Sequence, residues 1–198
     1  MLLRKYIGTK EFYKRVFVIT LPILIQQVIT NFVSLIDNIM VGQIGTEQMS
    51  GVAIVNQLLF VFNVCIFGGV SGAGIFTAQY FGKGDHKGVR ATFRAKIIIV
   101  SLMAAFCIGL FVFFDDELIS LFLHKGQDNL DLTATLAYGK QYLAIMLLQI
   151  PLFALNSAYS GTLRETGKTV PPMVGGIAAV GANVLLDYAL IFGVQPLG

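Results

Sequence analysis

The chain has 198 residues, of which 56% are hydrophobic and 13% are charged, with a net charge of +3 and a mean hydropathy of +0.76. Soluble domains usually contain about 25% charged and about 45–50% apolar residues, and a small domain cannot hide so large an apolar excess in one core. This composition argues against a soluble enzyme, a disordered chain and a nucleic-acid-binding domain. It indicates a membrane protein.

Five stretches without charged residues are long enough to cross a bilayer as helices. They contain 21, 35, 18, 23 and 18 residues, and a helix needs about 20 residues to cross a hydrocarbon core of about 30 Å. The second stretch is long for one span and short for two, so it predicts one long or tilted helix. We therefore expect an all-α membrane protein with five transmembrane helices. The predicted spans are residues 17–41, 51–80, 92–114, 134–160 and 171–193.

The basic residues predict how the spans are oriented. Twelve of the 14 Lys and Arg residues lie before the first span, between the second and third, or between the fourth and fifth, and Lys96 is assigned to the second of these loops. The opposite side has Lys125, Lys140 and five acidic residues. Because basic loops stay in the cytoplasm, we expect a multi-pass protein of the plasma membrane with a cytoplasmic amino terminus. Its ending after Gly193, without a stop-transfer charge, indicates a fragment of a longer chain.

One face of the first predicted helix is polar. On a helical wheel with Gln26 at zero, Asp37 falls at 20° and Asn31 at 140°, while apolar residues fill almost all of the remaining arc. Such a face must meet protein or water rather than lipid. Hydrogen bonds between helices would account for the amides, but a carboxylate within a span indicates a functional site.

The fifth predicted helix carries a second polar group. Asn183 and Asp187 are four residues apart and share one face with Gly176. Asp37 and Asp187 are both expected in the outer half of the bilayer. If the bundle brings them together, the two carboxylates cannot both ionise cheaply, and they titrate as a unit. Such a pair can hold a proton, or it can coordinate Na⁺ with the amide oxygen of Asn183 as a further ligand.

Other residues within the spans have two interpretations each. Pro22 either is tolerated in its helix or acts as a hinge. Tyr138 and Tyr142 either anchor the helix at the interface or line a cavity, and the glycine-rich run 68–74 predicts close helix packing. Neither a nucleophile–base pair nor a set of metal ligands is present, so we expect no enzyme and no metal site beyond Na⁺. The amides that either line a cavity or bond neighbouring helices are Asn56, Gln57, Asn63, Gln149 and Asn156, together with Gln26 and Asn31 on the first helix.

Several segments occur in register with these spans. They are Leu21-Pro22 and Asp37 in the first helix, Val41–Gly45 after it, Ala78–Asp85 at the end of the second, Ser160–Gly167 after the fourth and Ala182–Gly193 in the fifth. With these segments, the chain resembles the multidrug and toxic compound extrusion (MATE) family over nearly its whole length.

The resemblance implies a fold and an activity. Members of this family are antiporters of about twelve helices, built as two six-helix lobes around a central cavity, and they export cationic or amphipathic compounds in exchange for Na⁺ or H⁺. This chain would be most of the amino-terminal lobe, with the bilayer, a small-molecule drug and the missing carboxyl-terminal lobe as its partners. No cofactor beyond the coupling ion and no nucleic acid is implied.

The resemblance also implies roles for particular residues. Asp37, Asn183 and Asp187 match the family's cation site in this lobe, and Pro22 matches a proline that bends when the aspartate is protonated. A polar residue of the family's sixth helix falls beyond Gly198, so this set of ligands is incomplete.

Two alternatives remain open. A flippase of a lipid-linked sugar, from the same superfamily, would need a cationic cavity for the pyrophosphate, whereas the predicted spans contain acids and no Lys or Arg away from their ends. A non-transporting membrane scaffold would tolerate neutralisation of Asp37 and Asp187, and it would not bind Na⁺ or protons within the bilayer.

Overall fold

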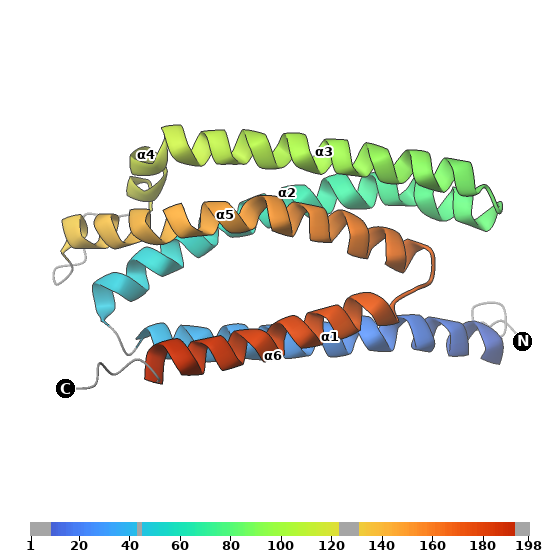
Figure 1. Cartoon of the computed structure of the whole chain (residues 1–198), viewed down its shortest axis with the longest axis horizontal. Coiled ribbons are helices and arrows are strands. Elements are labelled where there is room, and N and C mark those ends of the chain that lie inside the picture. The colour runs from blue at the N-terminus through green and yellow to red at the C-terminus, as the bar shows by residue number, and fades with distance from the viewer. Residues whose placement is uncertain (1–8, 43–44, 123–130, 193–198) are drawn as a thin grey trace, which may run out of the picture. The chain divides into compact units, whose positions relative to one another are not determined.

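The computed structural model describes residues 9–42, 45–122 and 131–192, except for the side chains of residues 41 and 187–192 (Figure 1). The residues that it describes form helices and turns without any strand, which confirms the predicted all-α class. The helices are α1 (Lys10–Gly42), α2 (Thr46–Gly82), α3 (His86–Phe113), α4 (Asp115–Ser120), α5 (Leu132–Glu165) and α6 (Val170–Phe192).

The long helices correspond closely to the predicted spans. Helices α1, α2, α3 and α5 are long and apolar enough to cross a membrane, and α6 contains a shorter apolar stretch, Val170–Leu186. The long second uncharged stretch forms one helix of 37 residues, as predicted. Helix α4 was not predicted, because its six residues are too few to produce a periodic pattern. The chain is an all-α membrane protein.

The chain divides into two compact units. The central unit consists of residues 38–166, and the terminal unit consists of residues 1–37 and 167–198. In the central unit, α2, α3 and α5 pack against one another and α4 packs near the amino-terminal end of α5. The buried stripe of α2 runs through Val55, Leu58, Phe62, Ile66 and Val70, whose spacing of three or four residues marks one helix face.

The two ends of the central unit differ in charge. At one end lie the α2–α3 turn and the carboxyl-terminal end of α5, which meet at the same end of the bundle (Figure 1). At the other end, Lys140 of α5 forms ion pairs with Asp115 at 3.2 Å and Asp116 at 2.9 Å. The α2–α3 turn and the start of α3 contain Lys83, Lys87 and Arg90. This basic segment and the acidic first turn of α4 therefore lie at opposite ends of the unit (Figure 1).

Two glycines allow α2 and α5 to approach closely near the α4 end. A Cβ atom on Gly51 would lie 2.8 Å from the backbone nitrogen of Gly139 and 2.9 Å from the carbonyl oxygen of Thr135. The side chain of Ile119 on α4 packs against Gly139 and is fully buried. No larger residue fits between these two backbones without moving them apart.

The glycine-rich run of α2 makes close contacts at only some of its positions. Gly69 lies against Met103 and Ile99 of α3, so the predicted close packing holds there. Cβ atoms built on Gly68 and Gly72 would meet no described atom within 4 Å. The spacing of small residues alone therefore did not distinguish the packed positions from the open ones.

Lys96 does not lie in a loop, and its assignment to one is wrong. It lies within α3, where its side chain is fully buried. The predicted span 92–114 already contained this residue, and in α3 it lies on the same buried stripe as Val100 and Ala104. The positive charge of Lys96 is thus inside the helix bundle.

Helix α5 has a carboxylate cap that predicts a dependence on pH. Asp131 accepts hydrogen bonds from the Thr133 hydroxyl and from the backbone N–H groups of Ala134 and Thr133, and these bonds lower the pKa of its carboxyl below the ordinary 3.8. A lowered pKa means that the cap stabilises the helix fully above the unfolded-state value, and that this stabilisation is lost as pH falls through the folded-state value. Asparagine also caps helices, but its side chain has no carboxyl group to protonate. We therefore expect Asp131→Asn to remove the part of the pH-dependent stability that comes from this cap.

Thermal unfolding in detergent, at neutral pH and below pH 3.8, measures the effect. The loss of stability on acidification should be smaller in Asp131→Asn than in the wild type. An equal loss in both proteins would show that Asp131 does not contribute to it.

Candidate functional site

The polar residues of α1 divide between a half-buried and an exposed face. Half-buried side chains recur at Pro22, Gln26, Val33 and Asp37, with a spacing that marks one face of the helix. Gln26 and Asp37 therefore lie on the face of α1 that is turned towards protein. Asn31 lies outside this face and is exposed, where its carbonyl oxygen accepts a hydrogen bond of 3.0 Å from the Gln27 amide.

Helix α6 presents a matching face. Its half-buried residues are Met173, Gly176, Val180 and Asn183, again three or four residues apart. This register confirms the expectation that Gly176 and Asn183 share one face. Asp187 lies one turn further along the same helix, and its side chain is outside the part that the structure describes.

Gly176 brings the two helices of the terminal unit into contact. A Cβ atom on Gly176 would lie 2.5 Å from the amide nitrogen of Gln26, so the Gln26 side chain rests directly against the α6 backbone. Gly175, the preceding residue, has no described atom within 4 Å of such a Cβ. The absence of a side chain at residue 176 is therefore what allows Gln26 to reach α6.

Asn183 provides a buried acceptor. Its Oδ1 atom is inaccessible to solvent and has no hydrogen-bond partner among the side chains and backbone that the structure describes. Leaving such an atom unpaired costs about 1–3 kcal/mol, so an amide oxygen in this state is suited to a bound cation or to a donor that binds with it. Amide and carboxylate oxygens are the ligands that hard cations prefer.

Among the remaining predicted residues, Pro22 lies inside α1, and the helix continues through it. Tyr138 is 39% exposed. Tyr142 is half-buried and donates a hydrogen bond of 3.3 Å to Asn56, which joins α5 to α2. Asn156, about four turns further along the same side of α5, is exposed and accepts a hydrogen bond from Ser160.

These residues belong to a polar surface of the central unit. Asn56 and Asn63 on α2 are seven residues apart, as are Tyr142, Gln149 and Asn156 on α5, and all except Tyr142 are exposed. We call these five residues the amide face. Because exposed amides are unfavourable against lipid, this face requires water or further protein beside it.

One buried charged group was missed by the sequence analysis. Lys96 of α3 forms an ion pair with Glu165 at the end of α5 and donates a further hydrogen bond of 3.3 Å to Thr162. The available signal was a lysine on the same helix stripe as Val100 and Ala104. Its partner lies 69 residues later in the chain, which no local pattern reveals.

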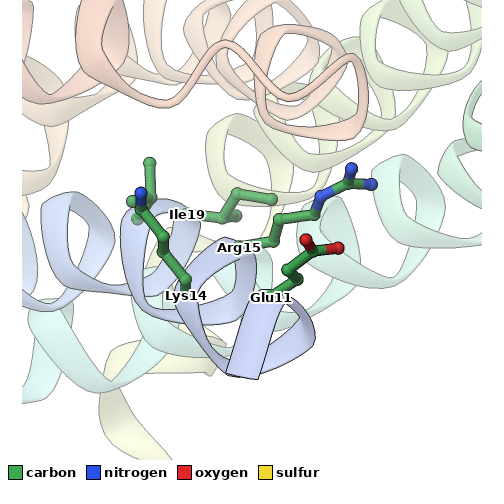
Figure 2. A pocket seen from close by; sticks show the side chains of 5 residues that line it. Glu11, Lys14, Arg15 and Ile19 are labelled. Atoms are coloured by element: carbon green, nitrogen blue, oxygen red, sulfur yellow. The ribbon is translucent and has the colours of Figure 1, made fainter. Parts of the chain in front are cut away.

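An open pocket of about 480 Å³ lies along the first turns of α1, and Figure 2 shows the charged side chains that line it. Its lining residues are Glu11, Lys14, Arg15, Val18 and Ile19. None of these residues belongs to the predicted cation site, and Asp37 lies 18 residues beyond the last of them. Charged heads above aliphatic side chains are typical of a helix where it enters the membrane interface.

The fold and these helix faces define a multi-pass α-helical membrane protein, whose polar groups lie along helix faces. The sequence profile of the MatE family matches residues 22–189. The chain belongs to the MatE family.

Several relatives are named as drug-resistance or drug-export proteins. The chain is 26% identical over 184 residues to the "Probable multidrug resistance protein NorM" of Thermotoga maritima, covering 92% of this chain and 38% of the relative. It is 24% identical over 195 residues to the "Multidrug export protein MepA" of Staphylococcus haemolyticus, covering 96% and 41%. It is 27% identical over 186 residues to a protein of Bacillus licheniformis also named as a probable NorM, covering 93% and 39%.

The chain thus spans about two fifths of the length of these relatives. No solved structure gives a significant match.

Proposed function

We propose that the chain is part of a cation-coupled exporter of cationic or amphipathic drugs in the plasma membrane, with a cytoplasmic amino terminus. Asp37, Asn183 and Asp187 bind the coupling ion, which is Na⁺ or H⁺. The ion and the drug are coupled because each prefers a different conformation of the protein. The names of the relatives support drug export, and family membership supports a transporter rather than an enzyme.

The observation that carries this proposal is the unpaired Oδ1 atom of Asn183. It lies on the same face of α6 as Gly176, which contacts Gln26 on the half-buried face of α1. Asp37 is on that face of α1, and Asp187 follows Asn183 by one helical turn. In this proposal the neutral amide oxygen of Asn183 acts as a ligand of Na⁺, or as a hydrogen-bond partner of a proton that the two carboxylates share.

The amide face supports the proposed class of substrate. It combines amide groups with the aromatic ring of Tyr142, and the spacing of seven residues on both helices extends it along several turns. Aromatic rings attract cations, and amide oxygens accept hydrogen bonds without adding charge. We infer that Asn156 and the rest of this face line the drug pathway, with Tyr138 at its end.

A flippase of a lipid-linked sugar is less well supported. Lys96 is a basic residue inside a predicted span, but its ammonium group is buried and engaged by Glu165 and Thr162. It is therefore not presented to a pyrophosphate. A scaffold without transport would have no need to keep the Asn183 oxygen unpaired at an energetic cost.

The test is drug efflux from proteoliposomes that contain the full-length polypeptide. A fluorescent cation is loaded, and its efflux is followed under an imposed Na⁺ gradient, an imposed H⁺ gradient, or neither. Efflux that depends on one gradient supports the proposal and identifies the coupling ion. No gradient-dependent efflux from correctly folded protein would overturn it, and binding of a lipid-linked sugar would then favour the flippase.

Adjacent glycines of α6 provide a matched pair of variants for the site. Gly176→Val should lower gradient-driven efflux at least about fivefold, because its side chain displaces Gln26 from the face that carries Asn183. Gly175→Val adds the same side chain where no described atom lies within 4 Å, and it should stay within about twofold of the wild type. The efflux rate, normalised to reconstituted protein, measures both variants. An equal loss of efflux in the two variants would show that the change in helix propensity causes the loss, and not the displacement of Gln26 from the site.

A further inference from the structure

The central unit contains a buried ion pair that the proposed ion and drug sites do not use. The side chain of Lys96 is completely buried, and that of Glu165 is 18% exposed. Isolated charges are expensive to bury, so a lysine in this position depends on its partner. The pair joins α3 to the last residue of α5.

The surroundings of the pair are shaped to hold it. Gly74 of α2 lies against the carboxylate of Glu165, at a place where any side chain would collide with it. One turn further along α2, the fully buried hydroxyl of Thr77 donates a hydrogen bond of 3.1 Å to Thr92 of α3. Thr77 lies about one turn from Gly74, and Thr92 lies one turn from Lys96, so all three long helices of the central unit contribute polar groups to this region.

Thr162 completes the arrangement. Its hydroxyl accepts a hydrogen bond from the Lys96 ammonium at 3.3 Å and donates one of 2.9 Å to the Ala158 carbonyl of its own helix. The Lys96 charge thus has two acceptors, both on α5. A slide or rotation of α3 against α5 would leave a buried ammonium group without them, at a cost of several kcal/mol.

We propose that Thr77, Thr92, Lys96, Thr162 and Glu165 form a clamp that holds this end of α2, α3 and α5 together as one rigid body throughout the transport cycle. The clamp fixes the relative position of the three helices, whereas their apolar contacts supply most of the packing energy. The part of this inference that concerns the transport cycle rests on the proposed function. The existence and the rigidity of the clamp do not depend on the proposed function.

The first test is a double-mutant cycle, measured by thermal unfolding of the full-length protein in detergent. Glu165→Gln leaves the ammonium of Lys96 buried without its counter-charge, and it should lower Tm by at least about 5 °C. Lys96→Met should have a smaller effect, because Glu165 keeps some contact with solvent. The double variant should be more stable than Glu165→Gln alone, since it contains no unpaired buried charge.

Lys140 provides the matched control. It also pairs with carboxylates in the central unit, but its side chain is 36% exposed, and exposed ion pairs contribute little. Lys140→Met should leave Tm nearly unchanged. If Glu165→Gln and Lys140→Met had equal effects, or if the double variant showed the full sum of the single losses, the clamp would be overturned.

The second test keeps the ion pair intact. Thr77→Cys and Thr92→Cys are combined in a background with Cys65→Ala and Cys107→Ala, so that the new thiols replace two hydroxyls 3.1 Å apart. At a fixed pH, oxidation should form a disulfide at a rate that does not change on adding Na⁺ or the fluorescent drug, since the thiolate fraction then stays constant. A rate that falls at least about threefold with either of these additions would show that α2 and α3 separate, and it would overturn rigidity.

The same variant separates this inference from the proposed function. If the reduced protein exports drug, the oxidised protein should do so within about twofold, and a loss that dithiothreitol reverses would show that the clamp must open. If neither form exports drug, the proposed function fails, while the unfolding and cross-linking results still decide the clamp.

Discussion

Replacing Asp37 by asparagine is expected to lower gradient-driven drug efflux at least about tenfold, while the amount of protein in the membrane stays unchanged. The substitution keeps the size of the side chain and removes its charge. Asp37 is half-buried on the face of α1 that also carries Gln26. A neutral amide there can neither release a proton nor balance the charge of Na⁺, so the ion no longer distinguishes between two conformations. The measurement is efflux from proteoliposomes under the gradient that drives the wild type.

Glu117→Gln is the matched control for this experiment. Glu117 lies on α4, its side chain is exposed, and the change from carboxylate to amide is the same. It should leave efflux within about twofold of the wild type. Normal efflux by Asp37→Asn, at normal protein levels, would contradict the assignment of Asp37 to the coupling site. If Asp37→Asn still let the drug cross the membrane without an ion gradient, the assignment would be supported. That result would show that the protein still transports the drug but no longer couples its transport to the ion.

Gly51→Ala is expected to lower the free energy of unfolding by about 1–3 kcal/mol. The added Cβ atom would lie 2.8 Å and 2.9 Å from backbone atoms of Gly139 and Thr135. Backbone atoms of a packed helix cannot rotate away as a side chain can, so α2 and α5 must separate. Ile119, which packs against Gly139, would lose contacts as well. Thermal or denaturant unfolding in detergent measures the change.

Gly72→Ala is the control in the same helix. A Cβ atom on Gly72 would meet no described atom within 4 Å, and alanine is favoured over glycine in a helix by about 1 kcal/mol. This variant should therefore be as stable as the wild type or slightly more stable. If the two variants behaved alike, the approach of α2 to α5 at Gly51 would not be a stability determinant.

The long helices could be predicted because their determinants are local. An uncharged stretch of sufficient length needs no information about neighbours to be recognised as a span, and α2 followed from its length alone. Helix α4 could not be predicted in this way, since it occupies six residues. The close contacts of Gly51 could not be predicted either, because they depend on which helix packs against α2 at that position.

The candidate site shows the same division. The shared face of Gly176 and Asn183 follows from the helical repeat, and the half-buried positions of α6 agree with it. That Gln26 fills the space at Gly176 depends on how α1 meets α6, which one sequence does not contain. Lys96 was misassigned for a related reason. A lysine near the start of a span normally faces the cytoplasm, and only its distant partner Glu165 makes burial tolerable.

The Lys96–Glu165 pair has a consequence for the synthesis and membrane insertion of the protein. The two residues are 69 positions apart, so at about 5–20 residues per second the ribosome adds the glutamate about 3–14 s after the lysine. During that interval α3 enters the bilayer with an ammonium group that has no counter-charge. Its four-carbon stem allows the group to reach the headgroups in the meantime. We therefore expect α3 to stay near the interface until α5 is synthesised. The unpaired ammonium group of Lys96 would then set the order in which the two helices insert fully.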